Sequence, residues 1–253
     1  LQAYRPVGAL SFLGRYRTID FPISNMSNSG IDNIEVYVRR KPRSLTEHLG
    51  TGRHYNINSK RGQLNIMYTE NNRIGDIYST DVAAYIENMD CIERIHLPYV
   101  VIAPSYMVYT ADYSTFLSEH IESGADISMM YHSVDNAKEA FLNCNTLNIN
   151  KQKGVLSIEP NHGNAKNKNI SMDTYVMSTE LFINLVKKAH KTSSMYTFAD
   201  ILNEECEELD IRAVSHRGYF AAICDFNSYY HANMDLIDLK HASYLFSPDW
   251  AIY

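Results

Sequence analysis

Short apolar runs alternate along the chain with longer segments in which apolar residues recur every three or four positions. Residues 99–103 form a run compact enough for a buried strand, whereas residues 82–95 follow helical spacing. The same criteria predict strands at 31–38, 99–103, 127–132, 170–177, 211–214 and 219–222, and helices at 22–29, 44–49, 80–95, 113–123, 179–189, 198–208 and 226–236. This order predicts an α/β fold with a doubly wound, mostly parallel sheet that binds ligands beyond the carboxyl ends of its strands.

Local signals define several of these helix boundaries. Pro22 has no N–H and therefore suits the first turn of the helix that Gly30 ends. Ser44 and Glu47 have the spacing of a capping box, which predicts that Ser44 caps the helix at 44–49. Asp112 precedes the helix at 113–123, where capping is the ordinary role of an aspartate.

Two polar segments interrupt the alternation of strands and helices. Residues 135–170 are rich in Asn and Lys and contain only short strands, which predicts a small antiparallel insert lying over the sheet. Residues 51–73 are also polar, with one apolar break at 64–67, and are typical of a hairpin or a mobile loop.

Composition indicates a globular protein with a substantial core. The chain has 253 residues, of which 45% are hydrophobic and 21% charged. Its net charge of -6 argues against a nucleic-acid or membrane-surface partner, although the basic residues at 39–43 are suited either to holding phosphates or to a solvated loop. Because no long apolar run and no signal pattern are visible, a cytoplasmic location is expected.

The four cysteines carry no motif. Cys91, Cys144, Cys206 and Cys224 are widely spaced, and no two of them form a CxxC pair. This spacing disfavours both a zinc site and a disulfide scaffold.

The most informative segment is residues 14–25, with the sequence GRYRTIDFPISN. Arg15 and Arg17 precede Asp20 in it, and from the residues alone a solvated ion-pair cluster is a reasonable interpretation. The segment also resembles a motif of the sugar-1-phosphate nucleotidyltransferases. Five further matches follow in the same order: Arg43-Ser44-Leu45-xx-His48-Leu49, Tyr109-xx-Asp112-Tyr113, Ser171-Met172-xx-Tyr175-Val176, Phe198-Ala199-Asp200-Ile201-Leu202 and Tyr229-xx-Ala232-Asn233-xx-Asp235-Leu236.

Together the six motifs resemble the nucleotidyltransferase domain of the glucose-1-phosphate adenylyltransferases (ADP-glucose pyrophosphorylases), and most of all their D-type (GlgD) regulatory subunit. The resemblance implies a Rossmann-like, GT-A-like sheet and assigns residues 1–246 to this domain, with the insert at about 135–170. Residues 247–253 would begin the linker to a C-terminal β-helix. The family's glycine-rich nucleotide loop would precede the first residue of the sequence.

The resemblance also implies a reaction, in which ATP and glucose 1-phosphate give ADP-glucose and pyrophosphate for glycogen synthesis. The family holds Mg²⁺ with two carboxylates that neutralise the triphosphate. Aligned on Tyr109-xx-Asp112-Tyr113, the first of these aspartates falls at Tyr106. Aligned on Ala232-Asn233, the second falls at Ala222, so both metal ligands are replaced and no metal ligand or catalytic residue is expected here.

Other family positions are partly kept. By resemblance, Ser171 is expected to meet a sugar hydroxyl, Glu159 belongs to the segment that grips the sugar phosphate, and Arg15 and Arg17 are expected to contact an anion or an adjacent subunit. The family's sugar-phosphate lysine is missing beside Glu159. The base-pocket stretch appears as residues 79–82, with the sequence STDV.

Three functions remain open at this point. The first is a regulatory or structural subunit that packs against a catalytic ADP-glucose pyrophosphorylase subunit, or against its own kind, and is itself inactive. The second is a working nucleotidyltransferase that recruits Mg²⁺ through other carboxylates, such as Asp225 or Asp81. The third is a doubly wound protein whose ligand is unrelated.

Overall fold

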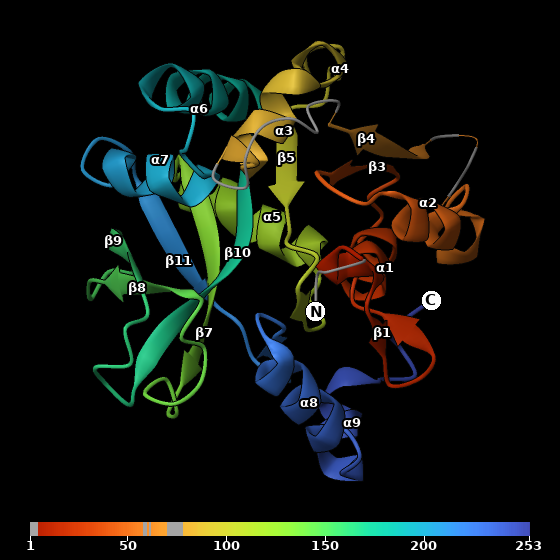
Figure 1. Ribbon diagram of the computed structural model, residues 1–253. Coiled ribbons are helices and arrows are strands. Elements are labelled where there is room, and N and C mark those ends of the chain that lie inside the picture. The colour runs from red at the N-terminus through yellow and green to blue at the C-terminus, as the bar shows by residue number, and fades with distance from the viewer. Residues whose placement is uncertain (1–4, 58–59, 61, 70–77) are drawn as a thin grey trace.

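A six-stranded sheet forms the centre of the computed structural model, which describes residues 5–57, 60, 62–69 and 78–253 (Figure 1). The strand order is β11 (Ile211–Ser215), β7 (Ile127–Val134), β10 (Lys168–Ser178), β8 (Asn145–Ile149) and β9 (Val155–Pro160), and β5 (Tyr99–Ile102) also pairs with β10. β11 is parallel to β7, whereas β5 and β7 are both antiparallel to β10. The predicted α/β, Rossmann-like class is confirmed, and within it the sheet is mixed rather than mostly parallel because β10 runs against its neighbours.

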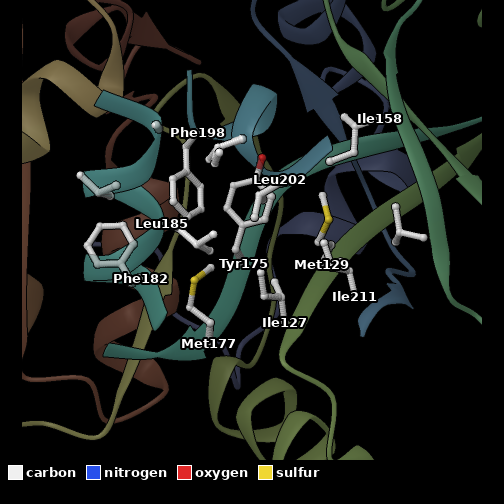
Figure 2. Packing of buried hydrophobic residues seen from close by; sticks show 14 of the residues in the cluster. Ile127, Met129, Ile158, Tyr175, Met177, Phe182, Leu185, Phe198, Leu202 and Ile211 are labelled. Carbon is white, nitrogen blue, oxygen red and sulfur yellow. The ribbon is translucent and has the colours of Figure 1, made fainter. Parts of the chain in front are cut away.

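Helices cover both faces of this sheet. On one face lie α3 (Asp81–Glu87), α4 (Met89–Glu93), α6 (Thr179–Thr192) and α7 (Phe198–Glu205), and on the other lies α5 (Tyr113–Ser123). Tyr175 and Met177 of β10 face the first layer, where they pack with Phe182, Leu185 and Phe198 (Figure 2). Val176 faces the second layer with α5. Alternate side chains of β10 therefore pack into two separate hydrophobic cores.

A second, smaller sheet lies beside the first. β3 (Asn33–Val38) and β4 (Gln63–Tyr68) form a parallel pair that is not hydrogen-bonded to the central sheet in the described part of the chain. α1 (Asp20–Asn28) and α2 (Arg43–Leu49) pack against β3 around Ile23, Val36 and Leu45. The hairpin or loop expected at 51–73 is therefore wrong for 63–68, where the backbone forms a parallel strand. Residues 58–59, 61 and 70–73 lie outside the described ranges.

The C-terminal part of the chain packs against its N-terminal part. α8 (Phe226–Asp235) and α9 (Leu239–Leu245) follow the two-residue strand β12 (Ala221–Ala222), and they share a core with Phe12 and Phe21. β1 (Ser11–Phe12) and β2 (Tyr16–Arg17) form a short antiparallel pair. The end of the segment 247–253, expected to begin a linker, contacts α1 through Trp250, Ala251 and Tyr253, and Tyr253 N–H donates to Ser24 Oγ at 3.0 Å.

The helix starts test the local signals directly. Asp112 caps α5 as predicted, with Oδ1 accepting the Ser114 N–H at 2.8 Å. The prediction for Ser44 is wrong because α2 begins at Arg43, after Pro42, which places Ser44 inside the first turn. Its hydroxyl is buried and has no hydrogen-bond partner among the described residues. α1 begins at Asp20, so Pro22 is its third residue.

The insert at 135–170 adds strands to the edge of the central sheet and does not lie over it. β8 pairs antiparallel with β9, and Thr146 of β8 pairs with Ile170 of β10. This extension buries Leu147, Val155 and Ile158 in the main core. None of the helices within the described ranges has the length and apolar character needed to span a membrane.

A pair of histidines, His216 buried and His132 half-buried, links β7 to the end of β11 and makes stability depend on pH. His132 Nδ1 lies 3.1 Å from His216 Nδ1, and His216 Nε2 lies 3.0 Å from the carbonyl oxygen of Thr110. Burial lowers the pKa of His216 to about 4, and it also lowers the pKa of His132. Between pH 6.5 and pH 4 the unfolded chain therefore binds a proton that folded His216 does not, so stability falls as the pH is lowered through this window.

We expect the free energy of unfolding to drop by about 3 kcal/mol from His216 alone between pH 7 and pH 4, since one pKa unit corresponds to about 1.4 kcal/mol. Urea unfolding of wild type and His216→Gln at pH 7 and pH 4.5 measures this contribution. The variant should show a smaller loss on acidification, and equal losses in both proteins would contradict the assignment.

Candidate functional site

A cavity of about 1430 Å³ lies between β3 and β5. Its walls come from residues 31–41 on one side and 97–106 on the other, with α1 and α3 completing it. Pockets for one small molecule are usually about 300–1,000 Å³, so this cavity has room for more than one small ligand.

The charges of the cavity fit an anionic ligand at one end. The basic residues that line it are Arg5, Arg39, Arg40 and Lys41. Three acidic residues, Asp32, Glu35 and Asp81, also line it. The basic segment 39–43 predicted to hold phosphates or to be solvated thus contributes three of its residues to the cavity. Arg39 donates from Nη1 to the Ser79 carbonyl oxygen at 2.6 Å, which connects this segment to the start of α3.

Tyr106 and Ala222 are brought together by two short strands at the edge of the cavity. β6 (Met107–Val108) pairs antiparallel with β12, so Ala222 faces Met107, and Ile223 N–H donates to the Tyr106 carbonyl oxygen at 2.7 Å. Tyr106 and Ile223 line the cavity. Two positions 116 residues apart in sequence, chosen by motif alignment, are therefore immediate neighbours in space.

Asp173, which sequence reasoning missed, brings a carboxylate to the same point. The Tyr106 hydroxyl donates to Asp173 Oδ2, and Asp173 Oδ1 accepts from Ser171 Oγ at 3.1 Å and from the Tyr175 hydroxyl at 3.2 Å. Asp173 has a positive φ of 46°, in an irregular stretch of β10 where the register shifts. The hydroxyls of Ser171 and Tyr175, two residues to either side on the same strand, thus converge with that of Tyr106 on one carboxylate.

The electrostatics of this cluster follow from burial. Burial raises the pKa of the Asp173 carboxyl, and the hydrogen bonds from Tyr106, Ser171 and Tyr175 oppose that rise. Burial, followed by the charge of Asp173, raises the pKa of Tyr106 well above its usual value. Tyr106 therefore stays protonated, and its hydroxyl donates a hydrogen bond to the Asp173 carboxylate.

The donor set at this point does not fit Mg²⁺. The ion prefers about six oxygen ligands in an octahedron, with carboxylates among them. Here the two aligned positions supply a neutral phenol and a methyl group, and the carboxylate of Asp173 already accepts three hydroxyl hydrogen bonds. No cluster of three or more His, Cys, Asp or Glu side chains positioned for a metal occurs in the described ranges.

The two other carboxylates considered as metal ligands, those of Asp225 and Asp81, accept hydrogen bonds from backbone N–H groups at the starts of helices. Asp225 caps α8, accepting the Ser228 N–H at 2.7 Å, and that hydrogen bond holds its pKa below the usual range. Asp81 Oδ1 accepts the backbone N–H groups of Val82 at 2.9 Å and Phe198 at 3.0 Å, which joins α3 to α7. Burial raises the pKa of Asp81.

The predicted substrate residues lie in three different places. Ser171 is fully buried, and its hydroxyl is engaged with Asp173. Glu159 is exposed on β9, where Oε1 accepts from Asn148 Nδ2 at 2.9 Å. Neither of them, nor Arg15 or Arg17, is among the residues lining the cavity. Their binding roles stay predictions.

Arg15, Arg17 and Asp20 do not form the solvated ion-pair cluster considered above. Arg15 is exposed, with its guanidinium 5.3 Å from the centre of the Tyr16 ring, and Arg17 Nη1 donates to the Ala9 carbonyl oxygen at 3.0 Å. Asp20 is 2% exposed. Its carboxylate accepts from the Tyr55 hydroxyl at 2.6 Å and lies 2.6 Å from His48 Nε2, so it holds α1 against α2.

A Rossmann-like α/β sheet with a basic-lined cavity at its edge is typical of nucleotide-binding proteins. The family model for nucleotidyl transferases matches residues 3–238. The chain belongs to the nucleotidyl transferase family.

Named relatives make the likeness more specific. The chain is 29% identical over 253 residues to a glucose-1-phosphate adenylyltransferase of Clostridioides difficile (strain 630), covering 97% of this chain and 64% of that protein. It is 27% identical over 255 residues to the glycogen biosynthesis protein GlgD of Geobacillus stearothermophilus, covering 98% and 62%. The chain thus spans somewhat less than two thirds of the length of these relatives. The resemblance inferred from the motifs is confirmed.

Among solved structures, a protein described as a glucose-1-phosphate thymidylyltransferase from Bacillus anthracis, in complex with sucrose, superposes with a TM-score of 0.73. The match covers 98% of this chain and 92% of that one, at 14% sequence identity. This likeness supports the fold alone.

Proposed function

We propose that this chain is a subunit of the ADP-glucose pyrophosphorylase type in glycogen biosynthesis, and that it acts as a regulatory, non-catalytic partner. The observation that carries the proposal is the pair Tyr106, just before β6, and Ala222 of β12, which lie side by side where the resemblance puts the two metal aspartates. A phenol and a methyl group replace the oxygen anions there.

The energetic consequence follows from the chemistry that the family performs. Joining ATP to glucose 1-phosphate requires neutralisation of the triphosphate charge while the sugar phosphate attacks, and two carboxylates holding Mg²⁺ supply this. Their loss raises the barrier by several kcal/mol, which lowers the rate by a factor of about a thousand or more, since each 1.36 kcal/mol is tenfold.

Binding is affected less by these replacements. Arg5 and Arg39 line the cavity and favour an anionic ligand such as a nucleotide or a sugar phosphate. In this proposal the chain packs against a catalytic subunit, and ligand binding in its own cavity changes the kinetics of that partner. Self-assembly is the alternative arrangement.

One observation favours a second candidate, a working nucleotidyltransferase. Asp173 places a buried carboxylate beside Tyr106, and rotation of the phenol would leave its Oδ2 available to a cation, while Oδ1 still accepts from Ser171 and Tyr175. This candidate predicts ATP binding that depends on Mg²⁺. Titration calorimetry with ATP, in Mg²⁺ and in EDTA, separates the two, because Mg²⁺-independent or undetectable ATP binding contradicts the second candidate.

The central experiment is co-purification with a catalytic ADP-glucose pyrophosphorylase subunit, followed by assays of each alone and of the mixture. We expect a stable complex, ADP-glucose formation by the chain alone at least a thousandfold below that of the catalytic subunit, and altered kinetics in the mixture. Turnover by the isolated chain at ordinary enzymic rates would overturn the proposal.

A further inference from the structure

Two of the four cysteines meet at the edge of the cavity, although 80 residues separate them. The Sγ atoms of Cys144 and Cys224 lie 3.6 Å apart. Both thiols are free, as are those of Cys91 and Cys206. Cys91 is exposed, and Cys206 Sγ donates to the Leu202 carbonyl oxygen at 3.2 Å.

The backbone holds both cysteines in place. Cys144 precedes β8, with its N–H donating to the Phe141 carbonyl oxygen at 3.1 Å and its own carbonyl oxygen accepting the Asn161 N–H at 2.9 Å. Cys224 lies between β12 and α8, where its N–H donates to Ser228 Oγ at 3.0 Å. A disulfide has a sulfur–sulfur distance of about 2.05 Å. The sulfurs therefore need to approach by about 1.5 Å, which side-chain rotation at two fixed backbones can supply.

The two thiols differ in access and in acidity. Cys224 lines the cavity, as does Asn143 next to Cys144, whereas Cys144 itself is only 2% exposed. The hydrogen bond from Cys144 holds the pKa of Cys224 below its usual range, and the same bond raises the pKa of Cys144. Cys224 is thus the accessible and more readily ionised sulfur, and Cys144 is the buried one behind it.

We propose that Cys144 and Cys224 form a reversible intramolecular disulfide by exchange with a low-molecular-weight disulfide, and that this bond ties the 135–170 insert to the start of α8 at the cavity edge. The proposal is independent of the function proposed above. The cysteine pair is then a redox modification site that lies next to Tyr106 and β12.

The exchange balances in two steps. The Cys224 thiolate attacks one sulfur of the small disulfide RSSR, which forms a Cys224–SR bond, breaks the S–S bond and releases RS⁻, which takes up the proton lost by Cys224. Cys144 then loses its proton and attacks Cys224 Sγ, which forms the protein disulfide and releases a second RSH. The two thiols are oxidised by two electrons, and RSSR is reduced to two RSH.

The tryptic map of the chain makes the bond easy to assign. Cleavage after Lys and Arg gives peptides 139–151 and 218–240, and each contains a single cysteine of the pair. The full chain is incubated under native conditions with glutathione disulfide, remaining thiols are alkylated, and the unreduced digest is analysed by mass spectrometry. We expect a dominant linked species, two hydrogens lighter than the sum of both peptides, which dithiothreitol removes.

Stability provides a second readout. A bond closing an 80-residue loop constrains the unfolded chain, so the oxidised protein should melt about 5 °C or more above the reduced one. Cys224→Ser should lose both the linked peptide and the shift in melting temperature. Cys206→Ser is the matched control and should retain both.

Two results would overturn the proposal. The first is a folded wild-type chain in which Cys224 carries glutathione while Cys144 is alkylated, because the thiols then do not meet. The second is linkage of Cys91 or Cys206 to the pair as often as the pair links internally, because this indicates shuffling in an unfolded chain. Since the wild-type map decides alone, a variant that fails to fold does not affect the conclusion.

Discussion

Replacing Tyr106 and Ala222 together with aspartate is expected to make the stability of the chain depend strongly on Mg²⁺. One new carboxylate would lie just before β6, at the position that contacts Asp173, and the other on its partner strand β12. Two like charges about 4 Å apart repel by about 4 kcal/mol at an effective dielectric constant of 20. Without metal, the double variant should therefore unfold at a markedly lower temperature than wild type.

Mg²⁺ should reverse this loss in the variant and leave wild type unchanged. Saturation at about 100 times the dissociation constant contributes about 2.7 kcal/mol, which corresponds to a rise of about 5–10 °C in melting temperature. Calorimetric melting in Mg²⁺ and in EDTA measures the rise. The double variant Tyr106→Asn and Ala222→Asn is the matched control, because asparagine has nearly the same shape as aspartate without the charge.

An equal response of wild type to Mg²⁺ would contradict this expectation, because it would mean that the native chain already holds the ion. A folded double variant with no response would also contradict it, because the two positions would then not form a metal site. The single variant Ala222→Asp extends the test if the double variant folds poorly.

Phe198→Ala should cost about 3–5 kcal/mol of unfolding free energy, the range for truncating a buried aromatic side chain. Phe198 is 1% exposed, and its ring lies 5.5 Å from that of Phe182 and 5.7 Å from that of Tyr175, centre to centre (Figure 2). The truncation leaves a cavity where α6, α7 and the sheet meet. Urea unfolding gives the change directly.

Phe226→Ala provides a closely matched control. Phe226 is also the first residue of a helix that begins with a capping box, but it is 65% exposed. We expect this variant to change stability by less than about 0.5 kcal/mol. Similar losses in the two variants would contradict the assignment of Phe198 to the core.

The sequence predicted well those features that depend on local chemistry. Asp112 caps α5 because an aspartate before a helix accepts free N–H groups wherever the helix lies. The strands predicted at 99–103 and 127–132 correspond to β5 and β7. Ser44 was predicted wrongly because Pro42 fixes a backbone angle that starts α2 two residues earlier than the capping pattern implies.

The parts of the site that depend on the tertiary fold were not predictable in this way. Asp173 looks like an ordinary polar position in a strand, and only the positive φ reveals that its carboxylate meets Tyr106. Cys144 and Cys224 carry no spacing signal because their contact is made by β8, β12 and α8 together. Motif alignment did bring Tyr106 and Ala222 to attention, because it carries three-dimensional information that composition and periodicity lack.

The irregular stretch around Asp173 also limits how this strand can change in length. Ser171 pairs with Tyr131 and Tyr175 with Met129, so four steps along β10 match two along β7, and β10 carries two extra residues. An even number keeps Tyr175 and Met177 on one layer and Ile170 and Val176 on the other. Deletion of one residue here would turn the side chains of half of the strand to the opposite layer. Deletion of two neighbouring residues would keep each side chain on its own layer. Viable length variants at this point should therefore differ by an even number of residues.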